Sequence, residues 1–372
     1  MPLLTGCDLP QVSAEERLFL NLKLDFLDDY QLPKQDFKGT RVGGLSGMTY
    51  DRQRDRFYAL SDDRSEFAPA RFYTLKLALD QANANTPQIK QVAIETVTTI
   101  MGEDSKPYVK GTIDPEGIAL SPLDTVFISS EGVTRDGIPP FVREFDLKTG
   151  KWKRNLQLPK RYSPDAEGDQ QTQGVQDNLG FESLTIASSS YGKTAVEPFR
   201  LFAATESALK QDISPMEQTQ GAKNRLLHYM LEARRALLIS EHLYQLDPPP
   251  NGAIAHGLTD LLAIDQGGHF LSLERSFGNK GFGVKLFQLA TGGATDISSI
   301  DSLKGTLRGT VAIPKKLLLD LSFLDVPLDN LEGMAIGPRL PDGSRSLLLV
   351  SDDNFRDEQV TQFLLFRLKG LG

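Results

Sequence analysis

The chain has 372 residues, of which 40% are hydrophobic and 24% are charged, and this ordinary globular composition excludes a disordered or fibrous protein. The formal net charge is −8 and no run rich in lysine or arginine occurs, so binding to nucleic acid is not expected. No apolar stretch reaches 18 residues, so no transmembrane helix is expected either.

The first residues contain the single cysteine of the chain, in the sequence Leu3-Leu4-Thr5-Gly6-Cys7. This sequence resembles the lipobox of bacterial lipoproteins, in which the cysteine is lipidated after signal cleavage. Only six residues precede Cys7, and a signal peptide needs a basic n-region and a longer apolar h-region. Two interpretations stay open, a lipoprotein remnant with a lipid anchor and an ordinary N-terminal cysteine. We expect residues 1–15 to be such a remnant or a linker, and 16–372 to form one domain.

Five segments of the chain align without gaps on one pattern of seven residues. They are 45–51, 115–121, 181–187, 258–264 and 331–337. A second motif, a short apolar run that leads to a carboxylate, follows each of them at 58–63, 127–132, 202–207, 270–275 and 348–353. Apolar runs of this length, bounded by turn residues, are typical of buried strands.

Further strands complete each repeat. A third is predicted at 71–77, 143–147, 225–231, 284–289 and 362–368, and a fourth at 89–100, 152–158, 236–246 and 309–319. The fifth repeat lacks a fourth strand, and the strand-like segment 18–25 is otherwise unpaired, so we expect this segment to close the ring. Four-stranded units repeated radially form a β-propeller. The sequence therefore predicts an all-β propeller, with five blades favoured over six and a two-domain β protein as the alternative.

Equivalent residues of a propeller occupy equivalent places around its axis, so each column of the repeat predicts a ring of side chains. Like charges 4 Å apart repel by about 1 kcal/mol in water and by about 4 kcal/mol at an effective dielectric constant of 20. An acidic ring therefore needs protonation, basic partners or a cation. Oxygen ligands suit hard cations, above all Ca²⁺. The candidate ligands are Asp62, Asp63, Glu116, Glu131, Glu182, Glu206, Asp260, Glu274, Glu332, Asp352 and Asp353. The alternative is a structural belt, in which these carboxylates bond to neighbouring backbone groups.

Basic residues recur near the start of the third strand, at Arg71, Arg143, Arg225 and Lys285. They either form salt bridges between neighbouring strands or bind an anion, since arginine matches the geometry of phosphate oxygens. Arg64 and Arg275 adjoin the acidic motifs directly and are the better candidates for contact with a substrate.

The motifs at 44–51, 59–64, 114–119, 180–184 and 330–335 occur in order and resemble the phytase-like family of bacterial proteins, described as having esterase-like activity. The resemblance covers about residues 40–368. This family is similar in name and architecture to the calcium-dependent propeller phytases, which hydrolyse phosphomonoesters with a calcium cluster and basic residues at the channel mouth. The resemblance implies an exported hydrolase, periplasmic or lipid-anchored, that acts on phosphoesters.

Under this hypothesis the carboxylates hold Ca²⁺, and Glu182, Arg64 and Arg275 are the catalytic candidates. The expected partner is a small anionic or ester substrate, and the expected state is a monomer. Two alternatives stay open: a calcium-dependent lactonase or carboxylic-ester hydrolase, and a non-catalytic propeller that binds a ligand or a protein. The architecture alone does not choose among them, because propellers have many functions.

Overall fold

The structure, a computed structural model, describes residues 17–80, 83, 86–187 and 197–371. Cys7 and the N-terminal segment predicted at 1–15 lie outside the described residues. No helix in the described part of the chain is long and apolar enough to span a membrane.

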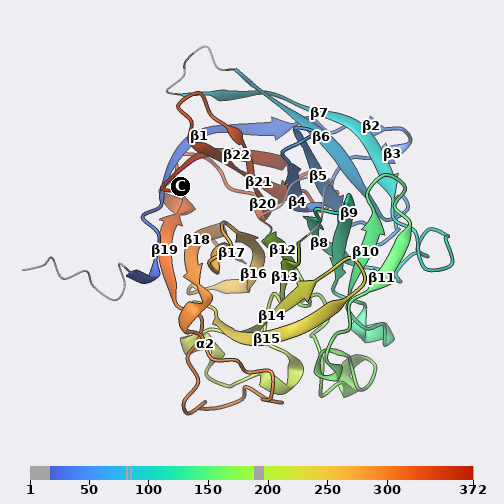
Figure 1. The fold of residues 1–372 in the computed structure, drawn as a ribbon, viewed down its shortest axis with the longest axis vertical. Coiled ribbons are helices and arrows are strands. Elements are labelled where there is room, and N and C mark those ends of the chain that lie inside the picture. The colour runs from blue at the N-terminus through green and yellow to red at the C-terminus, as the bar shows by residue number, and fades with distance from the viewer. Residues whose placement is uncertain (1–16, 81–82, 84–85, 188–196, 372) are drawn as a thin grey trace, which may run out of the picture.

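Five four-stranded antiparallel sheets surround one axis as the blades of a propeller, which confirms the predicted fold (Figure 1). Blade 1 contains β4 (Leu45–Asp51), β5 (Arg56–Ser61), β6 (Arg71–Asp80) and β7 (Gln88–Thr99), and blade 2 contains β8 (Pro115–Leu120), β9 (Thr125–Ser130), β10 (Phe141–Asp146) and β11 (Trp152–Asn155). Blade 3 contains β12 (Ser183–Ala187), β13 (Phe199–Ala204), β14 (Lys223–Leu231) and β15 (Ala236–Gln245), and blade 4 contains β16 (Ala253–Ala263), β17 (His269–Gly278), β18 (Gly281–Ala290) and β19 (Lys315–Asp320).

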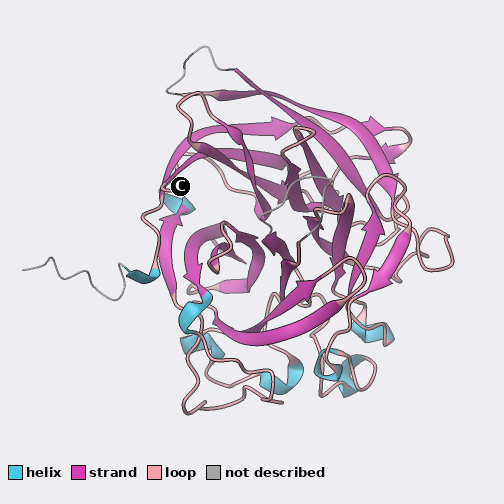
Figure 2. Ribbon diagram, viewed as in Figure 1, coloured by secondary structure: helices cyan, strands magenta, loops and turns pink. Residues whose placement is uncertain are grey.

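Blade 5 joins the two ends of the described chain. It consists of β20 (Asn330–Arg339), β21 (Arg345–Asp352), β22 (Thr361–Lys369) and the N-terminal strand β1 (Lys23–Leu32). A small two-stranded sheet, β2 (Asp36–Phe37) and β3 (Thr40–Arg41), follows β1. Helical turns, such as α2 (Glu217–Gln220), are short and lie in the connections between strands (Figure 2).

An N-terminal strand closes the ring, as predicted, but it begins later in the sequence than expected. β1 pairs with β22 from Lys23 opposite Lys369 to Leu32 opposite Thr361, whereas the prediction was 18–25. Leu22 precedes β1 and packs into the apolar cluster shared by blades 4 and 5, so its hydrophobicity reflects core packing rather than strand pairing. The fourth strand of blade 4 also begins later than predicted, at Lys315, directly after Pro314, which lacks an N–H to donate to a sheet.

The innermost strands contact one another in a closed ring, in the order β4, β8, β12, β16 and β20. The third position of the first motif is glycine in three repeats because these strands approach closely. A Cβ added at Gly47 would lie 2.5 Å from the carbonyl oxygen of Glu116, and one at Gly117 would lie 2.7 Å from that of Glu182. Each glycine therefore brings the backbone of one blade against the acidic position of the next.

Each pair of adjacent blades shares one apolar cluster. The ring centroids of Phe202 in β13 and Phe270 in β17, for example, lie 4.7 Å apart across the contact between blades 3 and 4. Burial of such side chains contributes roughly 25 cal/mol per Å² of apolar surface. These clusters fix the angles between blades, and so they position the strand ends at the channel.

Candidate functional site

A cavity of about 690 Å³ opens at one end of the channel. Its walls carry the carboxylates of Asp62, Glu116, Glu182, Glu332 and Asp352, the guanidinium groups of Arg64, Arg275 and Arg356, and the amides of Asn178, Asn330 and Asn354. The volume is within the usual range for a ligand site of roughly 300–1,000 Å³.

Two kinds of strand end bring these carboxylates together. Glu116 and Glu332 lie near the start of the innermost strands β8 and β20, and Glu182 directly precedes β12. Asp62 and Asp352 lie at the end of the second strands, β5 and β21. Because neighbouring strands run antiparallel, the start of one strand lies beside the end of the next. Both columns of the repeat therefore meet at the same end of the channel.

The acids form two overlapping groups with the spacing of a metal site. Oxygen atoms of Asp114, Glu116 and Glu131 lie within 4.8 Å of one another, and so do those of Glu131, Glu182 and Glu206. All five residues are buried. Glu131 belongs to both groups, so the two groups are adjacent.

Burial is the largest cause of raised pKa values throughout this cluster. The pKa values of Asp62, Glu116, Glu131 and Glu182 lie well above those of free carboxyls, because nearby carboxylates add to the desolvation. The pKa is raised to about 6 for Asp114, about 7 for Asp352 and about 8 for Glu332, and the pKa of Glu206 is also raised. The folded protein therefore resists full ionisation of this cluster unless another positive charge is present.

Two arginines supply part of that charge. Arg275 donates to Glu206 Oε1 at 3.0 Å and to Asn330 Oδ1 at 2.7 Å, and its Nη2 lies 3.6 Å from Glu332 Oε1. Arg64 forms a two-pronged contact with Asp114, at 2.7 Å from Nε and 2.5 Å from Nη2. Each guanidinium faces the cavity, so both remain available to an anion there.

The donor set fits a hard divalent cation. Seven buried carboxyls and the partly exposed Asp62 share two arginines; the buried ones are Asp114, Glu116, Glu131, Glu182, Glu206, Glu332 and Asp352. Asp62 Oδ1 is buried without a hydrogen-bond partner among the described residues. Carboxylate oxygens are ligands typical of Ca²⁺.

The structure does not bring four of the proposed ligands to the cavity or to the two acidic groups: Asp63, Asp260, Asp353 and Glu274. Asp63 accepts from the amides of residues 66–68 and pairs with Arg71 at 2.7 Å. Asp353 accepts from the amides of Gly44 and Phe355, and Asp260 accepts from those of Leu261 and Met334. These carboxylates hold loops and neighbouring strands together, which is the structural role considered as the alternative for the belt.

The predicted alignment of the second motif in the fourth repeat was wrong by one residue. Leu258 pairs with Glu274 and Gly257 with Arg275, whereas in blade 5 the equivalent Leu331 pairs with Ser351 and Asn330 with Asp352. Arg275, not Glu274, therefore occupies the ring position of Asp352. A shift of one residue turns a strand side chain to the opposite face. Glu274 consequently points away from the cavity and accepts from Tyr244 at 2.6 Å and Lys315 at 2.5 Å.

Sequence reasoning missed Asp114 and Asn330, although a signal for both exists. The residue before the first motif is glycine in three repeats, and Asp114 and Asn330 fill this column in the other two. A Cβ at Gly180 would lie 2.9 Å from Cα of Glu131, and one at Gly257 would lie 2.2 Å from Glu206 Oε1. Residues of this column therefore touch the acids, so a polar side chain there joins the site.

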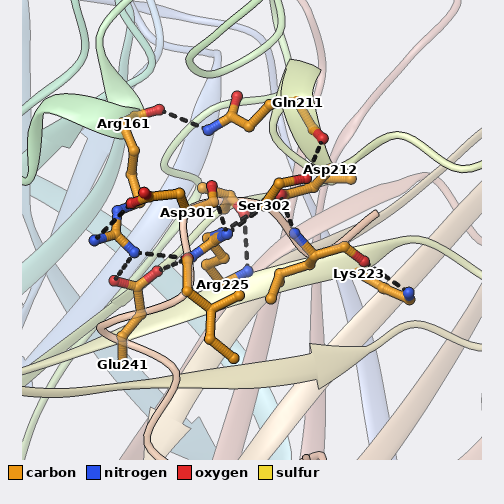
Figure 3. A network of polar contacts seen from close by, with 12 residues as sticks. Arg161, Gln211, Asp212, Lys223, Arg225, Glu241, Asp301 and Ser302 are labelled. Atoms are coloured by element: carbon orange, nitrogen blue, oxygen red, sulfur yellow. Dashed lines mark hydrogen bonds and ion pairs between the residues drawn. The ribbon is translucent and has the colours of Figure 1, made fainter. Parts of the chain in front are cut away.

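The basic residues of the third strands do not line the cavity. Arg71 pairs with Asp63, and Arg225 lies between Asp212 and Glu241 at 2.6 Å from each (Figure 3). Both agree with the salt-bridge interpretation. Arg143 instead donates to Tyr108 Oη at 2.8 Å and stacks 4.0 Å from the Phe141 ring centroid.

Comparison with known proteins gives a family and distant fold relatives. Residues 40–355 match the model of the phytase-like family, described as esterase-like activity of phytase. No curated protein matches. Among solved structures, an endo-arabinase from Bacteroides thetaiotaomicron has 9% identity and a TM-score of 0.45, covering 88% of this chain and 94% of its own. The calcium-binding protein regucalcin from Agrobacterium tumefaciens has 13% identity and a TM-score of 0.37, with 92% and 96% covered. Likenesses this weak carry no inference about chemistry.

Proposed function

This chain belongs to the phytase-like family, and on that premise we propose that it is a calcium-dependent hydrolase of phosphoesters. The observation that carries the proposal is the excess of acids around one open cavity: seven buried carboxyls and the partly exposed Asp62, with two arginines in contact with them. In a purely structural belt each carboxylate would pair with a basic residue, as Asp63 pairs with Arg71 in blade 1.

In the proposed site, Asp114, Glu116 and Glu131 hold one cation, and Glu131, Glu182 and Glu206 hold a second. Asp62, Glu332 and Asp352 line the same cavity and complete its negative wall, facing the entering substrate. Bound cations supply Lewis acidity toward a phosphoryl oxygen and lower the pKa of water. The carboxylates fix where that acidity acts, because the blade cores hold their strand ends rigidly.

Arg64 and Arg275 bind and orient the phosphoryl group in this proposal. Their guanidinium forks match the spacing of phosphate oxygens, and the acids that contact them keep them charged and oriented. The same contacts neutralise negative charge that develops on the phosphoryl oxygens during hydrolysis. Asn178 and Asn330 contact these two arginines and hold their planes.

The decisive experiment compares Glu182→Gln with Glu66→Gln. Glu182 lies in the candidate cation site, whereas Glu66 is an exposed glutamate that pairs with Lys110. We expect the calcium-dependent turnover of phosphate monoesters to fall at least 100-fold in Glu182→Gln and to be unchanged in Glu66→Gln. Full activity of a folded Glu182→Gln protein would remove Glu182 from the site.

A parallel panel of carboxylic esters and lactones tests the second candidate activity, which the esterase-like description of the family favours. Calcium-dependent turnover confined to carboxylic esters would move the proposal to that class. Absence of turnover on both panels, with calcium bound, would identify a non-catalytic binding propeller.

Export with a lipid on Cys7 is part of the proposal, on the basis of the lipobox-like sequence at 3–7. Incorporation of a labelled fatty acid into the protein, abolished by Cys7→Ala, is the expected result. Equal labelling of both proteins, or of neither, contradicts it.

A further inference from the structure

Blade 4 projects farther along the axis than its neighbours beside the cavity. Its second strand β17 spans 10 residues, against 6 in each of β5, β9 and β13 and 8 in β21. The hairpin formed by β17 and β18 ends with Phe277 paired to Phe282 and Gly278 paired to Gly281. The two phenyl rings lie 4.7 Å apart, tilted by 40°. The extra length of the blade therefore places a pair of aromatic rings at the channel mouth.

These two rings border two cavities at once. Phe277 and Phe282 line the acidic cavity, and they also line a second cavity of about 390 Å³ between the hairpin and the loop at 247–253. Phe277 remains 39% exposed, although a phenyl ring gains free energy when it is buried. The rings thus lie where the acidic cavity and the second cavity adjoin.

The rings are aligned with an arginine of the proposed site. Arg275 and Phe277 are two residues apart in β17, so their side chains are on the same face of the strand, about 7 Å apart along it. Ala255 pairs with Phe277 on the other side and also lines the acidic cavity. Its small side chain leaves that side of the ring uncovered.

The hairpin is held in place by its surroundings. A Cβ on Gly278 would lie 2.3 Å from the carbonyl oxygen of Gly252, so the two loops are in close backbone contact. His256 bonds to the carbonyl oxygens of Asp247 and Arg275, at 3.1 and 3.2 Å. The aromatic pair is therefore positioned before a ligand binds, and this reduces the entropic cost of binding.

We propose that Phe277 and Phe282 form a specificity subsite for an aromatic or apolar group of the substrate, attached to the anionic group that Arg275 binds. This inference rests on the proposed function for the position of the anionic group. It narrows the substrate class to monoesters of an aromatic or apolar alcohol, rather than those of a small hydrophilic or polyanionic one. Six acids on the cavity wall, against three arginines, also disfavour a polyanion.

A second exposed aromatic pair supplies a matched control. Phe67 and Phe355 lie 4.9 Å apart, and Phe67 is 60% exposed, but neither lines the acidic cavity. Phe67 is more exposed than Phe277, at 60% against 39%, so substitution of Phe67 removes exposed aromatic surface without touching the proposed subsite.

The test measures equilibrium binding of phenylphosphonate and methylphosphonate to the calcium-loaded protein by calorimetry. Neither ligand is an ester, so binding is read without turnover. We expect phenylphosphonate to bind about tenfold more tightly, a ratio that corresponds to about 1.4 kcal/mol. Phe277→Ala and Phe282→Ala should remove this preference and leave methylphosphonate binding unchanged, whereas Phe67→Ala should retain it. Thermal unfolding of each variant shows whether the hairpin remains folded, and Phe277→Leu should retain part of the preference.

Equal affinity of the wild-type protein for both ligands, no binding of either, or an unchanged preference in both alanine variants would overturn the subsite. Failure of the proposed function looks different. A protein that prefers phenylphosphonate through these rings but turns over no phosphoester keeps the subsite and loses the proposed reaction.

Discussion

Buried charge is arranged differently in two regions of this propeller. Between blades 3 and 4, Arg225 is fully buried and contacts the carboxylates of Asp212 and Glu241, each at 2.6 Å (Figure 3). At the channel mouth, seven buried carboxyls and the partly exposed Asp62 share Arg64 and Arg275. The pKa values of the acids at the mouth are raised, several of them strongly, by burial and by their neighbours. Burial of a charge is therefore no sign of function in itself, whereas an unbalanced group of charges is.

The balanced region, in which Arg225 pairs with Asp212 and Glu241, stabilises the contact between two blades. Arg225 also donates to the carbonyl oxygens of Ile300 and Asp301, in the long connection between β18 and β19. Lys223 donates to Leu303 and Gly305 in the same connection. The network thus fastens an insertion of blade 4 to blade 3, and its charges are satisfied within the protein.

The largest expected effect comes from breaking the balanced region. Arg225→Leu leaves Asp212 buried without its cation and Glu241 with Arg161 alone, at 3.8 Å, and the expected loss in the free energy of unfolding is about 3–5 kcal/mol. Denaturant unfolding in EDTA and in calcium should give the same loss. Arg234→Ala, which changes an exposed arginine in the same blade, should have no measurable effect. A loss below about 1 kcal/mol for Arg225→Leu would show that the network is not strongly coupled to folding.

Calcium should act on the unbalanced region alone. At a concentration a hundredfold above its dissociation constant, Ca²⁺ is expected to raise the free energy of unfolding by about 2.7 kcal/mol. Thermal unfolding in EDTA, in calcium and in magnesium measures this effect, with a larger shift expected for calcium. The same shift should be retained in Arg225→Leu. A wild-type protein that contains no metal and shows no shift would make the acidic cluster a structural belt.

Stability without metal should decrease as pH rises. Folding raises the pKa of Asp114 to about 6, of Asp352 to about 7 and of Glu332 to about 8, so the folded state retains protons that the unfolded chain has released. This stabilisation is complete below the ordinary carboxyl pKa and is lost as pH rises through about 6 to 8, by up to about 1.4 kcal/mol per pH unit for each proton. Unfolding in EDTA at pH 5 to 8 measures it. Stability that is flat or rising over this range would contradict the charge imbalance.

The smallest effect distinguishes the two regions most sharply. At pH 8 in EDTA, Glu131→Gln should leave stability unchanged or raise it by up to about 1 kcal/mol, because it removes a source of like-charge repulsion. The same change should weaken calcium stabilisation. Glu241→Gln removes a partner of Arg225, so it should lower stability equally with and without calcium. If both variants lose stability in EDTA, the two regions are not different in kind.

The sequence repeat predicted the architecture because the packing that produces the repeat is the same in every blade. Apolar runs of strand length and the glycine at the third motif position follow from the packing of one blade on the next. The same logic located most of the acids. It failed at Glu274, because register is fixed by pairing with β16 and not by the nearest carboxylate in the sequence. It also could not distinguish Asp62 from Asp63, since only the three-dimensional structure shows which carboxylate accepts loop amides.

The N-terminal strand of blade 5 has a consequence for how the protein acquires its structure. Lys23 pairs with Lys369, so β1 is synthesised before any other strand of the ring but has no partner until β22 is complete. Contacts between residues so distant in sequence slow folding, and unpaired strands in partly folded chains favour aggregation. Blades 1 to 4 can form in order during synthesis, whereas closure of the circle must be the final, slow step. Interrupted translation near the C-terminus should therefore yield chains with four formed blades and a free edge that associates with other chains.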